Sequence, residues 1–210
     1  MGEYRYVLPN GTARYQAFRI KDGVRTDLAA VSGSYAAAVN PVGQIASTHR
    51  RLEPPGRASQ RTHRAFLEDG VITELGTLGG QWSQAEGING DGHIVGQSAL
   101  GADGVLAGGY IWSAEEGMRR LPDAGGLAAP KAVNDDDVIA GTHTCTAAGA
   151  AGHAAFWAGP GAAPPLLPDP ATGTATMANA VNAQGEITGW AEAPDGSRRA
   201  LVWRPASRSS

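Results

Sequence analysis

A degenerate segment of about 46 residues recurs four to five times along this chain of 210 residues, and it restricts the fold more than any other feature. Each copy carries an Asn after a short apolar run, a Leu and an aromatic strand, and these landmarks keep step. They are Asn40, Asn89, Asn134 and Asn182; Leu28, Leu75, Leu121 and Leu167; and residues 17–20, 65–68, 109–112, 154–157 and 200–203. A period of about 40–50 residues with four short strands is typical of β-propeller blades, which bury their faces against neighbouring blades.

The repeat runs through the whole length and leaves no segment for a second domain. Thirty Gly, 13 Pro and 18% charged residues indicate many turns and few polar helix faces, and 42% hydrophobic residues supply a core. We therefore expect a single all-β propeller domain over residues 1–204, followed by a disordered C-terminal tail over residues 205–210.

Charge and cysteine content narrow the partners and the compartment. A net charge of −3 gives no reason to expect a nucleic-acid or acidic-membrane partner. The single Cys145 excludes an intrachain disulfide framework, and the first seven residues lack the apolar core of a signal peptide. No run approaches the roughly 18 apolar residues of a membrane helix. The sequence thus predicts a cytoplasmic protein with no membrane or nucleic-acid partner.

One repeat predicts strands at residues 35–40, 45–49, 63–68 and 71–76. The turn between the first two strands has Gly at its third position in three copies and Asp137 in the fourth, where we expect positive φ. First strands number four and aromatic strands five. We favour five blades, the first using Tyr4 to Leu8 with strands near 14–20 and 24–30. Four blades stay open if the N-terminal strands complete the last unit.

The best-preserved copy resembles a known family. It contains Arg64-Ala65-Phe66, Gly70, Glu74-Leu75-Gly76-Thr77-Leu78-Gly79-Gly80, Ser83-Gln84-Ala85-Glu86-Gly87-Ile88-Asn89 and Gly92-His93-Ile94-Val95-Gly96. This pattern is similar to the bacterial His-Ala-Phe (HAF) repeat family. The resemblance implies a β-propeller-like repeat fold and, for most members, an extracellular location, from which this chain departs by lacking an export signal. It implies no shared activity, so function is argued from particular residues.

Residues that differ between copies at an otherwise regular position indicate specialised sites. Near the end of the second strand the copies carry Thr48-His49, Gln97-Ser98, Thr142-His143 and Trp190-Ala191, and on the first strand Ala37 is replaced by Glu86, Lys131 and Asn179. We expect the variable side chains to converge at one mouth of a central channel. The predicted catalytic residues are His49, His143, Glu86 and Lys131; the predicted substrate-binding residues are Tyr35, Trp82, Gln97, Thr142, Met177, Asn179 and Trp190.

Each candidate also has a structural interpretation. Glu86 and Lys131 on adjacent blades are within reach of a plain salt bridge, and each His is open to a surface-loop role. Trp112, Trp157 and Trp203 are expected in the core between blades. The loop from Arg50 to Arg64 is either a solvated loop or a lid that offers guanidinium groups to a ligand.

Metal and nucleotide sites find no support in the sequence. His143 and Cys145 lack further ligands at zinc spacing. The run from Asn134 to Asp137 lacks the later Glu of a calcium loop, so we interpret it as a solvated turn. The Gly-rich stretches precede no helix, which argues against a phosphate-binding loop. We expect no metal and no cofactor.

Three functions remain. The first is a cofactor-independent acid/base enzyme of cyclase, isomerase or lyase type, acting on a small-molecule ligand in one central pocket. The second is a lectin-like carbohydrate-binding propeller, for which the divergence of equivalent positions is unfavourable. The third is a protein-interaction scaffold. The sequence leaves the ligand and the oligomeric state open.

Overall fold

The computed structural model describes residues 1–11, 13–28, 33–50, 63–102, 104, 106–123, 125–145, 151–162, 164–168 and 175–205. Residues 51–62 of the loop predicted from Arg50 to Arg64, interpreted as a solvated loop or a lid, and residues 206–210 of the predicted tail lie outside these ranges. Within them, seventeen strands form five antiparallel sheets, with no helix. None of the described residues therefore provides a long apolar helix that could cross a membrane.

The five sheets follow one another in sequence order, and each is built from consecutive strands. Sheet 1 contains β1 (Gly2–Val7), β2 (Ala13–Lys21) and β3 (Val24–Asp27); sheet 2 contains β4 (Ser34–Val39), β5 (Ile45–Arg50), β6 (His63–Glu68) and β7 (Ile72–Glu74). Sheet 3 contains β8 (Ser83–Ile88), β9 (Ile94–Ala99), β10 (Ala107–Ser113) and β11 (Gly117–Arg120). Sheet 4 contains β12 (Gly126–Val133), β13 (Ile139–Cys145) and β14 (Gly152–Trp157); sheet 5 contains β15 (Thr176–Val181), β16 (Ile187–Glu192) and β17 (Arg198–Trp203).

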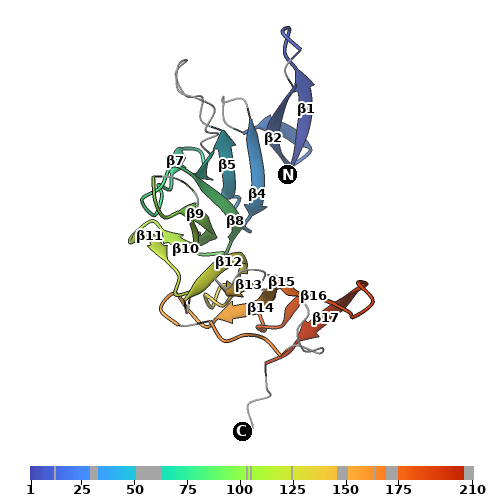
Figure 1. Ribbon diagram of the computed structural model, residues 1–210. Coiled ribbons are helices and arrows are strands. Elements are labelled where there is room, and N and C mark those ends of the chain that lie inside the picture. The colour runs from blue at the N-terminus through green and yellow to red at the C-terminus, as the bar shows by residue number, and fades with distance from the viewer. Residues whose placement is uncertain are drawn as a thin grey trace.

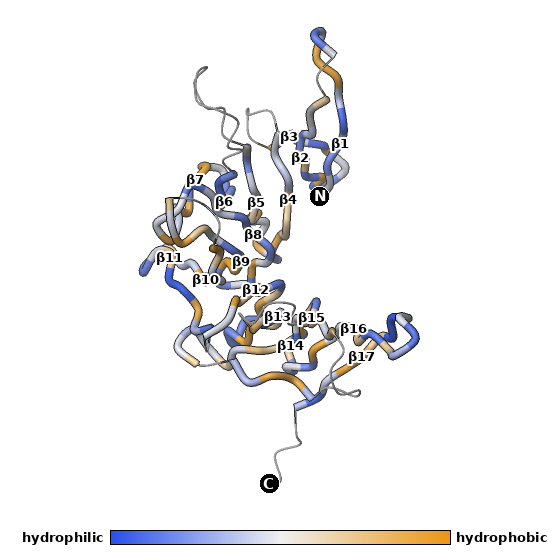
Figure 2. Tube along the Cα trace, in the orientation of Figure 1, coloured by the Kyte–Doolittle hydropathy of each residue, from blue (hydrophilic) through white to orange (hydrophobic). Residues whose placement is uncertain are grey.

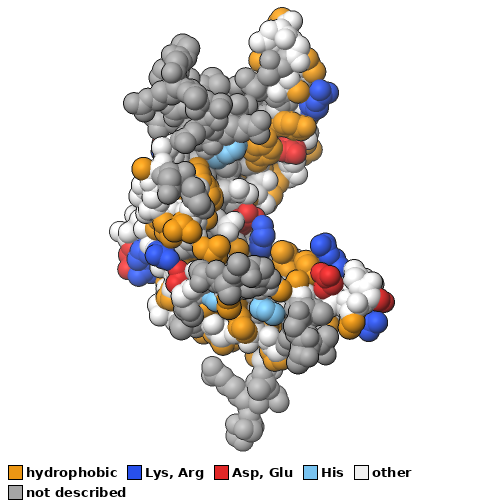
Figure 3. Space-filling model, viewed as in Figure 1, with side chains coloured by type: hydrophobic (Ala, Val, Ile, Leu, Met, Phe, Trp, Pro, Cys, Tyr) orange, Lys and Arg blue, Asp and Glu red, His pale blue; other side chains and the backbone are white. Residues whose placement is uncertain are grey.

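The sheets lie round an arc that is open between sheet 1 and sheet 5 (Figure 1). The first strands of sheets 2 to 5, which are β4, β8, β12 and β15, lie on the concave side and contact one another in order. Strands β7 and β11 lie on the convex side. The space-filling view shows the molecule hollowed on the side towards which the arc opens (Figure 3).

The strand predictions agree with the structure to within a few residues. Residues 63–68 are β6 as expected, and the first two strands of the repeat are β4 and β5. The turn residues Gly43, Gly92, Gly185 and Asp137 all have positive φ, with Asp137 at 57°, which confirms the turn prediction. Sheet 4 differs, because its described fourth-strand region makes only an isolated bridge between Ala155 and Leu166.

Four apolar clusters occupy the four interfaces between successive sheets, because alternate side chains of each strand face opposite neighbours. Figure 2 shows apolar stretches in the strands and a hydrophilic turn between β16 and β17. Trp112 and Trp157 are buried in these clusters, and Trp203 packs against a third, as predicted. Crowding on the concave side is severe at Gly87, where a Cβ would lie 3.0 Å from the Lys131 carbonyl oxygen.

The repeated Leu and Asn each make the same hydrogen bond in successive copies. The backbone N–H of every landmark Leu donates at 2.8–2.9 Å to a carbonyl of the aromatic strand of its own copy, and the acceptors are Ala17, Ala65, Gly109 and Ala154. The side-chain amides of Asn40, Asn89 and Asn134 each donate a hydrogen bond of 3.0 Å to the backbone carbonyl of the next landmark Asn, and the series ends at Asn182. We call this series the Asn ladder. It joins sheets 2 to 5 at one end of their inner strands.

Each inner strand contains a β-bulge at a position that differs in all four copies. The register between the first and second strands shifts across Ala37, Glu86, Lys131 and Asn179. A bulge leaves one residue unpaired and redirects its side chain. The repeat therefore presents one freely variable side chain per inner strand.

Candidate functional site

The two recurring histidines lie inside β5 and β13 and are buried between sheets, at 3% and 6% exposure. The surface-loop interpretation of His49 and His143 is therefore wrong. The second strands extend through these positions, and the odd-numbered side chains of β5 and β13 face the preceding sheet.

His49 belongs to a buried polar cluster with Ser47 and Glu68. Its Nε2 lies 2.9 Å from both Ser47 Oγ and Glu68 Oε1, and Ser47 Oγ donates to the same Glu68 oxygen at 2.6 Å. The imidazole stacks on Phe66, with 4.3 Å between ring centroids. A catalytic triad places its acid and its hydroxyl on different imidazole nitrogens. Here both face Nε2, so the cluster has the geometry of a satisfied buried group.

Sequence reasoning missed Ser47 and Glu68, although a signal was present. Ser47 stands where the other copies have Gly96, Gly141 and Gly189, and Glu68 stands where they have Trp112, Trp157 and Trp203. Searching the second strand and the aromatic strand for residues that depart from the repeat would have found both.

His143 occupies the equivalent place in sheet 4 but has different neighbours. Its Nε2 is hydrogen-bonded to the Asp123 backbone carbonyl, which lies in the connection between sheets 3 and 4. The ring packs so closely on Gly126 that no side chain fits there. His143 therefore fixes the connecting segment against sheet 4.

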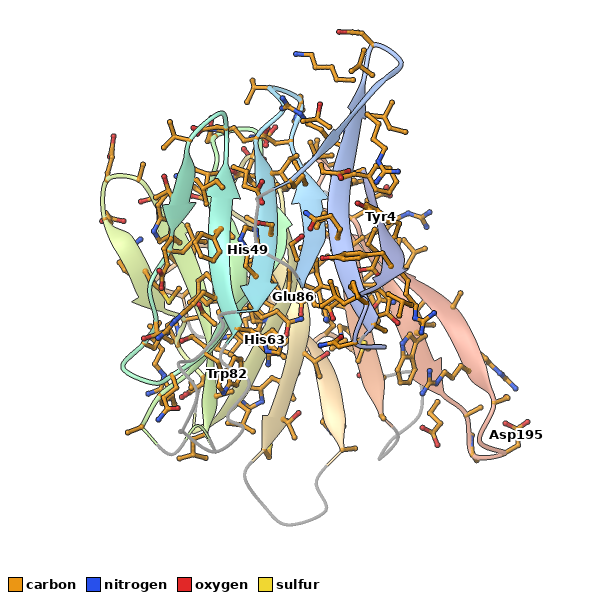
Figure 4. All side chains as sticks on the ribbon, turned by 90° about the horizontal axis from the view of Figure 1, so that it is seen from above. Tyr4, His49, His63, Trp82, Glu86 and Asp195 are labelled. Carbon is orange, nitrogen blue, oxygen red and sulfur yellow. The ribbon has the colours of Figure 1, made fainter. Side chains whose placement is uncertain are left out.

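Glu86, which is labelled in Figure 4, meets Lys131 across two adjacent bulges of the inner strands. Lys131 Nζ lies 2.8 Å from Glu86 Oε2, and Gln84 Nε2 donates to Glu86 Oε1 at 3.0 Å. The Lys131 side chain is 37% exposed and the Glu86 side chain 16%, so solvent reaches the pair. Burial, reinforced by the Glu86 carboxylate, raises the pKa of the neighbouring Tyr110 well above its usual range. The predicted contact between Glu86 and Lys131 is confirmed.

The remaining candidates lie in several places. Tyr35 stacks on Tyr15 of sheet 1, and Trp82 Nε1 donates to the Gly104 carbonyl in its own sheet at 3.3 Å. Met177 and Trp190 are cross-strand partners in sheet 5, where the Arg198 guanidinium lies 4.1 Å above the Trp190 ring.

Three further candidates complete the set. Gln97 pairs with Gln84 in register, the buried Thr142 hydroxyl has no hydrogen-bond partner among the described residues, and Asn179 is exposed at its bulge. Among the described candidates, the structure thus joins Glu86 to Lys131 and sets Met177 opposite Trp190. It holds the two histidines in separate interfaces.

A large apolar groove lies elsewhere, between sheets 4 and 5. Its volume is about 860 Å³, and none of the eleven candidates lines it. We call it the sheet 4–5 groove. Its lining is Asn134, Asp136, Val138, Phe156, Leu167, Pro168, Ala183, Gln184, Gly185, Ile187, Val202, Trp203, Arg204 and Pro205.

Two positions of the repeat distinguish this groove from the neighbouring interface between sheets 3 and 4. At the same place between sheets 3 and 4, His93 Nδ1 and Asp137 Oδ1 lie 2.7 Å apart and only a hollow of about 80 Å³ remains. The equivalent positions between sheets 4 and 5 hold Val138, four residues after Asn134, and Gly185, three residues after Asn182. An apolar side chain and a glycine cannot form a polar bridge.

We call the His93–Asp137 pair the clasp, and it corrects the interpretation of residues 134–137 as a solvated turn. Asp135 Oδ1 accepts from the Gly90 N–H at 2.6 Å, and Asp137 accepts from Asn89 Nδ2 at 3.1 Å. The turn therefore joins sheet 4 to sheet 3. Asp135 and Asp136 themselves remain exposed.

The part of the chain that the structure describes contains no group of three or more His, Cys, Asp or Glu side chains arranged to hold a metal ion. Polar groups at the groove are an ion pair, a carboxylate and two amides. Arg204 Nε lies 2.9 Å from Glu186 Oε1 beside the groove, and Asp136, Gln184 and Asn134 line it.

Consecutive antiparallel sheets round a concave side define a β-propeller-like all-β fold. Among solved structures, TolB from Acinetobacter baumannii, a β-propeller, is similar, with a TM-score of 0.54 and 15% sequence identity over 90% of this chain. The match covers 51% of the TolB chain, so this chain spans about half its length. No family model and no curated protein matches the sequence, and the similarity to the HAF repeat family stays a prediction.

Proposed function

We propose that this chain is a small-molecule-binding β-propeller whose five sheets are its blades, and that the ligand binds in the sheet 4–5 groove. The supporting observation is an apolar hollow of about 860 Å³ at the place where the neighbouring interface, between sheets 3 and 4, has the His93–Asp137 pair. Ligand sites are typically cavities of about 300–1,000 Å³ with apolar walls and a few polar groups.

The lining indicates the class of ligand. Phe156, Leu167 and Trp203 provide flat and branched apolar walls, and the Trp203 indole is held by its Nε1–H bond of 2.9 Å to the Pro168 carbonyl. Arg204 adds a guanidinium at the edge, where it already pairs with Glu186. A molecule with an apolar ring system and one acidic group therefore fits the groove best.

The test closes the groove by copying the clasp from the neighbouring interface. Val138→His with Gly185→Asp restores the pair found at His93 and Asp137, and Asp tolerates this backbone because Asp137 has positive φ at the same place. The probe is anilinonaphthalene sulfonate, an anionic aromatic dye whose emission rises in apolar surroundings. We expect the closed variant to bind the dye at least about tenfold more weakly, which is about 1.4 kcal/mol.

A matched control adds the same two side chains at open turns. Val42 is 71% exposed, and Gly196 has positive φ with no atom within 4 Å of a would-be Cβ. The double variant Val42→His, Gly196→Asp should bind the dye as the unchanged chain does. The reverse exchange, His93→Val with Asp137→Gly, should add a second dye site. Equal dye affinity in the closed and control variants, or no dye binding by the unchanged chain, would contradict the proposal.

An acid/base enzyme is the second candidate, supported by the solvent-accessible Glu86–Lys131 pair on the concave side. A carboxylate and an ammonium on one surface provide a proton acceptor and a stabiliser of negative charge. Glu86→Gln keeps the shape and removes the base, so any turnover found in a substrate screen should fall at least about a hundredfold with little change in melting temperature. Unchanged turnover would remove Glu86 from the mechanism.

A further inference from the structure

The inner edge of β1 is unpaired among the described strands, whereas each of the other four sheets has a first strand at the equivalent edge. Gly2 pairs with Phe18 as Ser47 pairs with Phe66, so β1 is equivalent to β5, a second strand of the repeat. In sheets 2 to 5 a first strand pairs with the inner edge of that second strand. In sheet 1 no described strand does so, and β1 is an edge strand.

The repeat identifies which backbone groups of β1 face this edge. Arg5 is equivalent to Ala99 and Glu192, three residues after Gly2, Gly96 and Gly189. The N–H of Ala99 donates to the Trp82 carbonyl at 3.0 Å, and that of Glu192 donates to the Ala175 carbonyl at 2.9 Å. Both acceptors lie next to an inner strand. The Arg5 N–H therefore points to the inner edge and away from β2.

The Asn ladder has an unfilled position beside the same edge. The backbone carbonyls of Asn89, Asn134 and Asn182 each accept two hydrogen bonds, one from their own turn and one from the preceding Asn side chain. Within the described chain the Asn40 carbonyl accepts only the turn bond, from Gly43 N at 3.0 Å. An Asn side chain bound on the inner side of sheet 1 would donate the second hydrogen bond to the Asn40 carbonyl.

Contacts within sheet 1 hold β1 in a fixed position. β1 pairs with β2 over six residues, and Tyr4 OH donates to Asp27 Oδ2 at 2.9 Å. The Arg25 guanidinium lies over the Tyr4 and Phe18 rings, at 4.1 and 4.7 Å from their centroids. These contacts fix the template before any partner arrives, which lowers the entropic cost of strand addition.

We propose that the inner edge of β1 binds an extended segment of a partner protein that has the inner-strand pattern of this repeat. All four inner strands end in Ala or Gly, then Val or Ile, then Asn, as in Gly87-Ile88-Asn89. The bound segment runs antiparallel to β1 and its Asn donates to the Asn40 carbonyl. Strand addition at an exposed edge takes affinity from main-chain hydrogen bonds and specificity from alternate side chains. This site is separate from the sheet 4–5 groove and does not depend on the proposed function.

The test uses a fluorescent peptide with the sequence of residues 78–90, titrated with the full chain and followed by anisotropy. Arg5→Pro removes the inner-edge donor and leaves the bonds to β2 in place, and Arg5→Ala is its matched control. We expect Arg5→Pro to weaken peptide binding at least about tenfold relative to Arg5→Ala. A peptide with Ala in place of its Asn should bind the unchanged chain about fivefold to tenfold more weakly.

Hydrogen exchange of the unchanged chain keeps the test independent of how Arg5→Pro folds. The peptide should protect the amides of Glu3 and Arg5, which face the inner edge, and leave Tyr4 unaffected. No binding of the peptide, protection confined to other strands, or equal affinity of the two Arg5 variants would overturn the proposal. Concentration-dependent dimers that Arg5→Pro abolishes would also overturn it, because the occupant would then be a second copy of the chain.

Discussion

Sheet 4 has one interface with sheet 3 and one with sheet 5. Both are built from the same repeat, but one is closed by a polar pair and the other contains a groove. In both, a Trp indole donates to a prolyl carbonyl, Trp157 to Pro122 at 2.8 Å and Trp203 to Pro168 at 2.9 Å. In both, an Asn side chain joins the two sheets. The interface between sheets 3 and 4 is then closed by His93 and Asp137, whereas the one between sheets 4 and 5 opens into the groove.

This contrast separates the conserved scaffold of the repeat from the positions it leaves free. Bonds that use the backbone carbonyl as acceptor persist in both interfaces, because every residue supplies that acceptor. The clasp needs two particular side chains, so exchange for Val and Gly removes it without disturbing the strands. The fourth strand β11 also covers the outer side of sheet 3, and sheet 4 has only a bridge there. The pocket thus lies at the interface of sheet 4 that lacks both the His–Asp pair and a full fourth strand.

The largest expected effect compares the two tryptophans. Trp157 is fully buried, so Trp157→Ala should cost about 3–5 kcal/mol of unfolding free energy or prevent folding. Trp203 is half-buried and borders a hollow that already exists, so Trp203→Ala should cost about 1–2 kcal/mol and mainly weaken dye binding. Denaturant unfolding followed by far-ultraviolet circular dichroism measures both. Equal losses would mean that the two interfaces are packed alike.

The smallest expected effect is a pH dependence beside the groove. The hydrogen bond from Arg204, and then that from Asn182, holds the pKa of Glu186 below its ordinary value. A lowered carboxyl pKa stabilises the fold fully above the ordinary pKa of about 4.3, and this stabilisation is lost as pH falls through the lowered value. Arg204→Gln should therefore raise the Glu186 pKa, measured by NMR titration, and flatten the fall in stability below about pH 4. The same titration curve in both proteins would rule out the pair.

The candidate site was only partly accessible to sequence reasoning. Comparing copies identified the bulge positions, including Glu86 and Lys131, because a residue outside the ladder is free to vary. The same comparison did not reveal that His49 is buried, since burial depends on how far the second strand runs and on which sheet it faces. The groove escaped notice because a pattern of single residues, such as Val138 and Gly185 among its lining, does not show an empty volume.

The sequence by itself determined the strands, their order and the turns, because side-chain alternation and positive-φ residues act within a few positions along the chain. Residues 63–68 and the turn at Asp137 show this. Only the tertiary structure decided what the landmark Asn does, which interface is open and which edge is unpaired. Those properties depend on the backbone of the neighbouring sheet, roughly one repeat away in sequence, and no local pattern specifies how closely two such segments approach.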